Sequence, residues 1–87
     1  MVSHKVIVRN KSGIHARPAG VLSQAANKCQ SSVTIHVGDK IVQVKSILNL
    51  MAAAIKCGTE IEVQCDGETE AEDLKTIVEV IESGLGE

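Results

Sequence analysis

Apolar and polar residues alternate in four short segments of the chain, which is the pattern of β-strands with one buried face. The residues Gly38-Asp39 separate the second and third segments, so these two should form a hairpin with a two-residue turn. The apolar residues of the four segments are Val6 and Val8; Val33, Ile35 and Val37; Val42 and Val44; and Ile61, Val63 and Cys65.

Two helices are indicated before the last strand. From Pro18 to Cys29 apolar residues recur at helical spacing, and Pro suits a first helical turn because its missing N–H has no partner there. The helix should therefore begin directly after His15. Ser46 precedes a short apolar run, so its hydroxyl is placed to cap a second helix, which Gly58 should end.

The chain ends with a third helix. Thr69 to Glu72 has the pattern of a capping box, and an apolar stripe continues from Leu74 to Leu85. Packing all the apolar faces together gives an α+β fold, a two-layer open-faced sandwich with three helices on one face of a four-stranded antiparallel sheet. With 87 residues there is material for one core, so we expect residues 1–87 to form a single domain.

Composition excludes several classes of function. Hydrophobic residues make up 44% and charged residues 23% of the chain, as in globular proteins. Phe, Tyr and Trp are absent, so these usual platforms for base stacking are missing, and without a nucleic-acid-binding motif we expect no direct contact with nucleic acid. No apolar run is long enough to cross a bilayer and no signal peptide opens the chain, so we expect a cytoplasmic protein without membrane insertion.

The cysteines and the charges are less informative. Cys29, Cys57 and Cys65 form no Cys-x-x-Cys pair, which favours reduced thiols, and no ligand spacing supports a metal or another cofactor. Residues 1–46 hold seven Lys or Arg against one acidic residue, whereas residues 47–87 hold two against ten. If the fold gathers the basic positions on one face, that face will attract phosphate or an acidic partner, but a solvated surface without a partner has the same charge count.

His15 has the most evident chemistry in the chain. It lies where a loop becomes a helix N-terminus, two residues before Arg17. Free N–H groups there favour a bound anion and disfavour a protonated imidazole, which leaves the nucleophilic form. The charge of a phosphohistidine could be held by the amides of Ala16 and Arg17 and by the Arg17 guanidinium. The residues alone equally allow a His15 that only caps the helix.

The segment from Gly13 to Ala19, Gly-Ile-His-Ala-Arg-Pro-Ala, resembles the active-site signature of the HPr family, the histidine-containing phosphocarriers of the bacterial sugar phosphotransferase system. Lys45-Ser46-Ile47 resembles the regulatory serine site of that family. Met51, Gly58 and the terminal residues Gly84 to Glu87 extend the similarity over nearly the whole chain. The resemblance also implies the sheet order first-fourth-second-third.

By this resemblance, His15 accepts a phosphoryl group from phospho-enzyme I through Nδ1, Arg17 assists the transfer, and the group passes to the A domains of sugar permeases. The protein would be a phosphoryl carrier, not an enzyme, and we expect a monomer. Ser46 would be phosphorylated by HPr kinase/phosphorylase, and the product would bind a catabolite-control transcription factor. A mainly regulatory module acting through phospho-Ser46 is the alternative, although such a module would most simply lack the acceptor imidazole.

The resemblance further implies a partner surface made of Gly20, Lys45, Ile47, Leu48 and Met51. A helix this short cannot bury all its apolar residues, so some should be exposed to partners. Equally, the preceding strand or the final helix could cover them.

Four residues depart from the family pattern on or near this surface. Asn49 and Ala54 stand where many relatives have glycine, Gly20 where a larger residue is usual, and Leu48 where Met or Phe is common. The departures put the strength of partner binding in question. Two further histidines, His4 and His36, fall in predicted strands and are expected to be ordinary surface residues.

Overall fold

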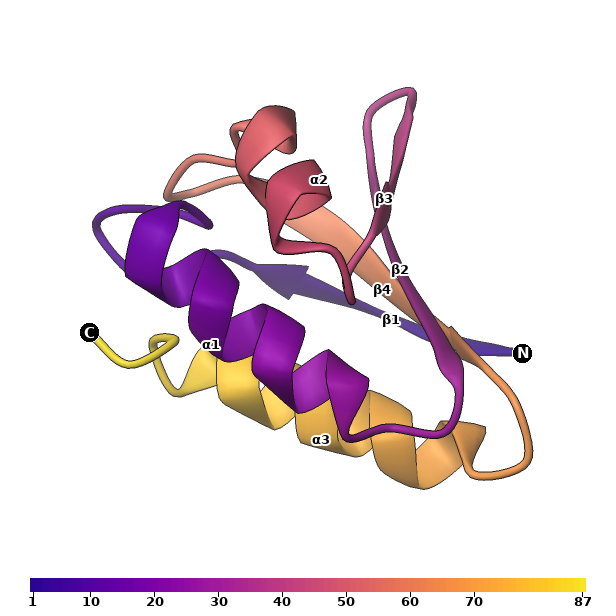
Figure 1. Cartoon of the computed structure of the whole chain (residues 1–87). Helices are drawn as coiled ribbons and strands as arrows, with labels where there is room; N and C mark the ends of the chain where they lie inside the picture. Colours follow the sequence, from indigo (N-terminus) through magenta and orange to yellow (C-terminus); the bar gives the residue numbers. More distant parts are fainter.

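The computed structural model describes all 87 residues and has the predicted order of elements (Figure 1). The four strands are β1 (Val2–Ile7), β2 (Ser32–Val37), β3 (Lys40–Gln43) and β4 (Glu60–Asp66). The three helices are α1 (Ala16–Asn27), α2 (Ile47–Ala53) and α3 (Glu70–Glu82).

The strands form one antiparallel sheet in the order β1-β4-β2-β3, as the resemblance implied. The pairing places apolar residues opposite one another on the same face, for example Ile35 of β2 opposite Val63 of β4 and Val42 of β3. The two-residue turn at Gly38-Asp39 is also confirmed, since Val37 pairs with Lys40.

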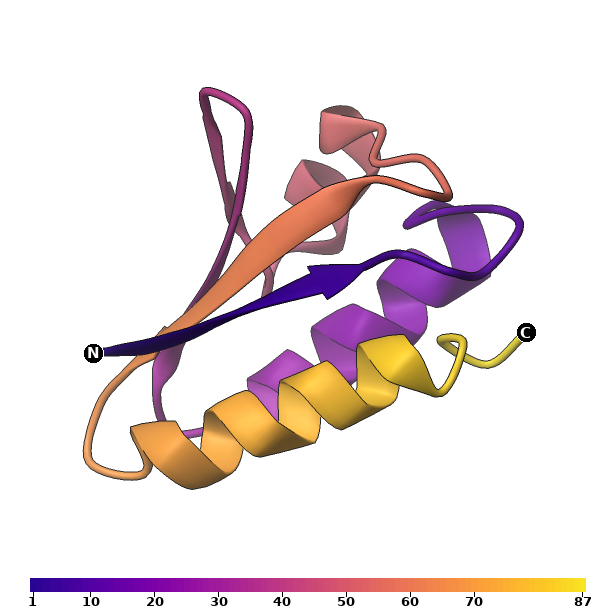
Figure 2. The same cartoon turned by 180° about the vertical axis from the view of Figure 1, so that it is seen from behind.

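All three helices lie on one face of the sheet, and the other face is open (Figures 1 and 2). This arrangement confirms the predicted open-faced α+β sandwich. Between the two layers lies a core of 19 buried Val, Ile, Leu, Ala and Cys residues. The fully buried Leu and Ile side chains each contribute roughly 1.5–3 kcal/mol through burial, so the core needs no aromatic residue.

Helix α2 ends earlier than predicted. Its last residue is Ala53, and Ala54 adopts the left-handed conformation with φ 52°. The predicted terminator, Gly58, lies beyond this cap, in the turn before β4. The prediction was wrong because glycine usually occupies the left-handed cap, and here alanine does.

The predicted capping box of α3 is not formed. Thr69 is the N-cap residue, but its hydroxyl donates to Asp73 Oδ2 at 2.7 Å and accepts no bond from the helix. The side chains that secure this end are Asp73, which accepts the Ser31 N–H at 3.1 Å, and Glu70, which accepts the Gly67 N–H at 3.2 Å. The acidic side chains in the first turn of α3 therefore accept hydrogen bonds from the neighbouring loops, and not from the amides of the helix itself.

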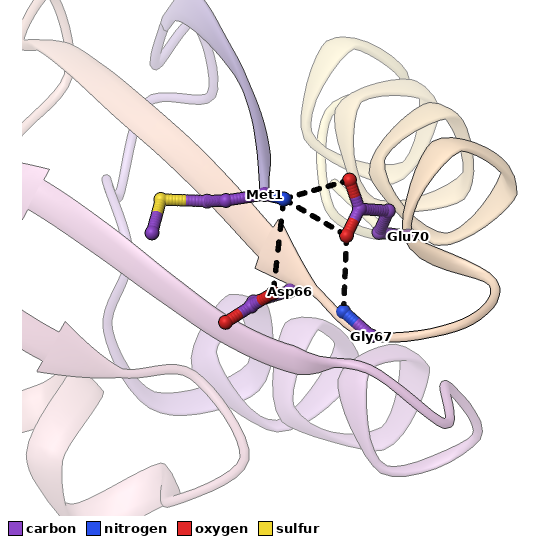
Figure 3. Close-up of polar contacts among 4 residues, drawn as sticks. All are labelled: Met1, Asp66, Gly67 and Glu70. Carbon is purple, nitrogen blue, oxygen red and sulfur yellow. Dashed lines mark hydrogen bonds and ion pairs between the residues drawn. The ribbon is translucent and has the colours of Figure 1, made fainter.

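The amino group of Met1 joins the same corner of the molecule (Figure 3). It lies 2.8 Å from a Glu70 carboxylate oxygen and 3.7 Å from Asp66 Oδ1. The hydrogen bond to the ammonium group lowers the pKa of Glu70, and the carboxylate in turn raises the pKa of the amino group. These contacts fasten the start of β1 to the turn between β4 and α3.

Candidate functional site

The loop before α1 is fixed by backbone contacts with the segment after α2. Ile14 is buried, and its N–H donates to the Ile55 carbonyl at 2.8 Å. Gly13 has φ +67°, and a Cβ at this position would lie 2.3 Å from the Ile55 oxygen. Only glycine fits so close an approach. The contact fixes the position of the backbone just before His15 and helix α1.

His15 is the N-cap residue of α1, with extended backbone dihedrals of −145° and 154°. Its imidazole is exposed and makes no capping hydrogen bond. His15 thus fills the capping position, as the alternative interpretation expects, but its side chain bonds no amide of the helix. The ring is accessible at the N-terminus of α1, directly before the first helical turn.

Two backbone amides beside His15 have no acceptor in the protein. The N–H groups of Ala16 and Arg17 donate to no protein atom, and Pro18 has no N–H. Ala16 also has φ 45°, a left-handed conformation that costs a residue with a Cβ roughly 1–2 kcal/mol. The free amides and the positive end of the helix dipole suit an anion, such as the oxygens of a phosphoryl group.

Arg17 is exposed and forms no ion pair. It still acts through space on Glu87, whose pKa is lowered mainly by hydrogen bonds from Ser12 and Asn10 and to a smaller extent by Arg17. A guanidinium without a fixed partner can turn its donors toward phosphoryl oxygens bound near His15.

Ser46 caps α2 as predicted. Its Oγ accepts the Asn49 N–H at 3.2 Å. The residue before it, Lys45, is tied to α1 through its carbonyl oxygen, which accepts from Ser23 Oγ and Asn27 Nδ2, both at 3.0 Å. The start of α2 is thus attached to α1 by two side chains, Ser23 and Asn27, that belong to no recognisable sequence motif.

The apolar residues of α2 divide between the core and the surface. Leu50 is fully buried and Met51 is half-buried, whereas Ile47 is 41% and Leu48 is 76% exposed. A Cβ on Gly20 of α1 would lie 3.6 Å from Ile47 Cδ1. Gly20 lies against Ile47 across the two helices, and Gly20, Ile47, Leu48 and Met51 are together called the α1–α2 patch below.

The remaining reactive side chains are spread over the fold. Cys29 and Cys65 are buried and Cys57 is exposed, all three as free thiols. Burial raises the pKa of Cys65 to about 11 and also raises that of Cys29. No three His, Cys, Asp or Glu side chains lie together where they could hold a metal ion. His4 is exposed and His36 is half-buried.

One contact at the site has no signal in the local sequence. The carboxylate of Glu87 reaches back to Asn10 and Ser12 in the loop before His15. These residues are separated by 75 positions or more in the chain, and no local pattern indicates the contact. No helix in the structure is of a length and hydrophobicity that would let it cross a membrane.

Residues 2–83 match the family model for the PTS HPr component phosphorylation site. The chain is 49% identical over 67 residues to the phosphocarrier protein HPr of Mycoplasma capricolum subsp. capricolum, a match that covers 77% of this chain and 75% of the relative. It is 40% identical over 82 residues to the HPr-like protein Crh of Bacillus subtilis, covering 94% and 96%. A crystal structure of HPr from Thermoanaerobacter tengcongensis has a TM-score of 0.95 at 34% identity, covering 100% of this chain and 98% of the other. A dimer of the same protein has a TM-score of 0.79.

Proposed function

The chain belongs to the HPr family of phosphocarrier proteins, and from this premise we propose that His15 receives a phosphoryl group from phospho-enzyme I and passes it to the A domains of sugar permeases. The observation that best supports the proposal is the exposed His15 imidazole at a helix N-terminus, beside the two free amides of Ala16 and Arg17. The protein then carries the group and leaves catalysis to its partners.

The chemistry consists of two successive displacements at the same phosphorus atom, the first onto His15 and the second away from it. Nδ1 of His15 attacks the phosphorus atom as the bond from phosphorus to the donor atom of enzyme I breaks. Negative charge on the phosphoryl oxygens can be met by the amides of Ala16 and Arg17 and by the Arg17 guanidinium. Imidazole is then the leaving group when an acceptor on the permease A domain attacks the same phosphorus.

The partner surface in this proposal comprises the α1–α2 patch together with Lys45. Ile47 and Leu48 supply exposed apolar area next to the first turns of α1. A partner seated there covers His15 from the side of α2 and excludes water from the transfer. We place this exchange in the cytoplasm, with one copy of the chain serving each partner.

The proposal is tested by incubating the protein with enzyme I and labelled phosphoenolpyruvate. We expect label on the protein that is lost in acid and retained in base, as a phosphohistidine requires. His15→Ala should take up none, whereas His36→Ala, which removes a histidine from the sheet, should be labelled normally. Undiminished labelling of His15→Ala would refute the assignment.

We also propose regulation at Ser46, because its hydroxyl lies at the N-terminus of a helix that carries part of the partner surface. HPr kinase/phosphorylase would add a phosphate there, and a catabolite-control transcription factor would bind the product. The phosphate adds about two negative charges at a helix start, which tolerates them. The same charges should repel an acidic surface on enzyme I, so phosphorylation of His15 would slow.

A pair of variants separates charge from capping at this position. Ser46→Asp and Ser46→Asn both retain a side chain that can cap α2, but only aspartate adds a charge. We expect Ser46→Asp to accept phosphoryl from enzyme I more slowly than Ser46→Asn at equal melting temperature. Equal rates for the two variants would leave Ser46 with a structural role alone.

A further inference from the structure

The C-terminal segment after α3 is anchored in the fold. Leu85 is fully buried, and it has φ 53° between Gly84 and Gly86, which also have positive φ. A Cβ on Gly86 would lie 3.3 Å from Val21 Cγ2 of α1. This path turns the chain back over α1, so that Glu87 arrives at the loop before His15 from a fixed direction.

The Glu87 side chain uses both carboxylate oxygens on that loop. Oε1 accepts from Asn10 Nδ2 at 2.9 Å and from the Ser12 N–H at 3.2 Å, and Oε2 accepts from Ser12 Oγ at 2.6 Å. These donors account for most of the lowering of the Glu87 pKa. The carboxylate is therefore ionised at neutral pH and engaged with the loop.

Asn10 extends this network toward the acceptor histidine. Its Nδ2 also donates to the Gly13 carbonyl at 2.6 Å, and the Gly13 N–H donates to the Asn10 carbonyl at 3.1 Å. Asn10 is only 6% exposed, so its side chain has little freedom. Displacing the carboxylate would free Ser12 from both of its bonds to Glu87 and leave the Asn10 side chain held by Gly13 alone, which loosens one side of the turn that leads into His15.

We propose that Glu87 is a positioning residue for the phosphoryl acceptor: its carboxylate holds Asn10 and Ser12 so that the loop presents His15 and the free amides of Ala16 and Arg17 in one arrangement. The inference rests on the proposed function of His15. Glu87 lies outside the α1–α2 patch, so its loss should affect the transfer step more than the docking of enzyme I.

The test compares single-turnover phosphoryl transfer from phospho-enzyme I to wild type, Glu87→Ala and Glu82→Ala. Glu82 is a matched control because it is exposed beside Glu87 at the same shallow hollow and makes no side-chain hydrogen bond. We expect Glu87→Ala to lower the rate at saturating donor by about fivefold, with the half-saturating donor concentration changed by less than about twofold. Glu82→Ala should change neither value.

Two further variants separate positioning from charge. Glu87→Gln keeps a carbonyl oxygen that can accept from Asn10 and the Ser12 amide but loses the charge near Arg17, so we expect it to retain most of the rate. Ser12→Ala combined with Glu87→Ala should be no slower than Glu87→Ala alone, because both changes disable one clamp. A Glu87→Gln rate as low as that of Glu87→Ala would assign the effect to charge and overturn the positioning role.

A structural readout independent of enzyme I completes the test. In 1H–15N spectra, Glu87→Ala should shift the amide signals of residues 14–17, and Glu82→Ala should leave them in place. Unchanged signals, or a Glu87→Ala rate equal to that of the wild type, would overturn this inference alone. A wild-type protein that accepts no phosphoryl group would overturn the proposed function, and this inference with it.

Discussion

At the scale of single residues, the site is distinguished by polar groups that the fold leaves without partners at the surface. The His15 imidazole, the Arg17 guanidinium and the amides of Ala16 and Arg17 are all free of intramolecular bonds. Among the buried side-chain nitrogen and oxygen atoms, by contrast, only Asn10 Oδ1 and Ser31 Oγ have no hydrogen-bond partner. Groups of this kind gain most from an incoming anion, because no existing contact has to break first.

Arg17 should matter for rate and not for folding. Its side chain is exposed and unpaired, so Arg17→Gln should leave the melting temperature unchanged. Transfer from phospho-enzyme I should slow at least about tenfold, equivalent to roughly 1.4 kcal/mol of transition-state stabilisation. Arg17→Lys keeps the charge but loses the planar pair of N–H donors, so its transfer rate should lie between those of the wild type and Arg17→Gln. If Arg17→Gln transfers at the wild-type rate, the guanidinium is only a solvated group.

Asp73 should make stability depend on pH in the acid range. Hydrogen bonds from Ser31, through its backbone N–H, and from the Thr69 hydroxyl lower the pKa of Asp73 below the usual value of 3.8. A lowered folded-state pKa means that the ionised carboxylate stabilises the fold above about pH 4, and that this contribution is lost as pH falls through the folded-state pKa. Asp73→Asn should therefore unfold at lower urea concentration at pH 7, with a smaller further loss at pH 3 than in the wild type. Parallel losses in the two proteins would contradict this assignment.

At the scale of elements, alternation and helical spacing were sufficient for the order of strands and helices and for most of the core. The errors fall at element ends, where the deciding contacts are tertiary. Ala54 ends α2 in a conformation that usually signals glycine, and Thr69 bonds to Asp73 although its sequence fits a capping box. Neither the end of α2 nor the N-cap contact of α3 can be predicted from local sequence, because each depends on the residues that the fold brings close.

The left-handed cap of α2 predicts a stabilising substitution. Ala54 has φ 52°, so Ala54→Gly relieves backbone strain at an exposed position. We expect a gain of roughly 0.5–1 kcal/mol in the free energy of unfolding by urea titration. Ala52→Gly, at an exposed position inside the same helix, should instead lose up to about 1 kcal/mol. A loss from Ala54→Gly comparable to that from Ala52→Gly would show that the cap is not strained.

Gly20 in α1 allows the reverse substitution, from glycine to alanine. It lies inside the helix, and an added Cβ would meet Ile47 Cδ1 at an ordinary contact distance of 3.6 Å. Gly20→Ala should thus raise stability by about 0.5–1 kcal/mol, measured by thermal or urea unfolding. Gly13→Ala is the contrast, because its Cβ would lie 2.3 Å from the Ile55 oxygen, and it should destabilise strongly. A fall in stability for Gly20→Ala would mean that the two helices cannot accommodate the methyl group.

At the scale of the whole molecule, the fold gathers distant segments at one end. The loop before α1, the segment after α2 and the C-terminal residues lie near one another, while the contacts of Met1 with Glu70 and Asp66 close the opposite end (Figures 1 and 2). The candidate residues His15, Arg17 and Ser46 could be identified from sequence because each belongs to a local motif. The clamp by Glu87 could not, since its partners are separated from it by nearly the whole chain.

Of the three imidazoles in the chain, we expect that of His15 alone to carry the phosphoryl group. This expectation is tested most directly by recording the imidazole resonances of protein labelled with 15N-histidine, before and after addition of enzyme I and phosphoenolpyruvate. His4 and His36, both in the sheet, serve as internal controls. We expect only the His15 resonances to move, and to return after brief acid treatment. Movement of His4 or His36 in place of His15, or no movement at all, would contradict it.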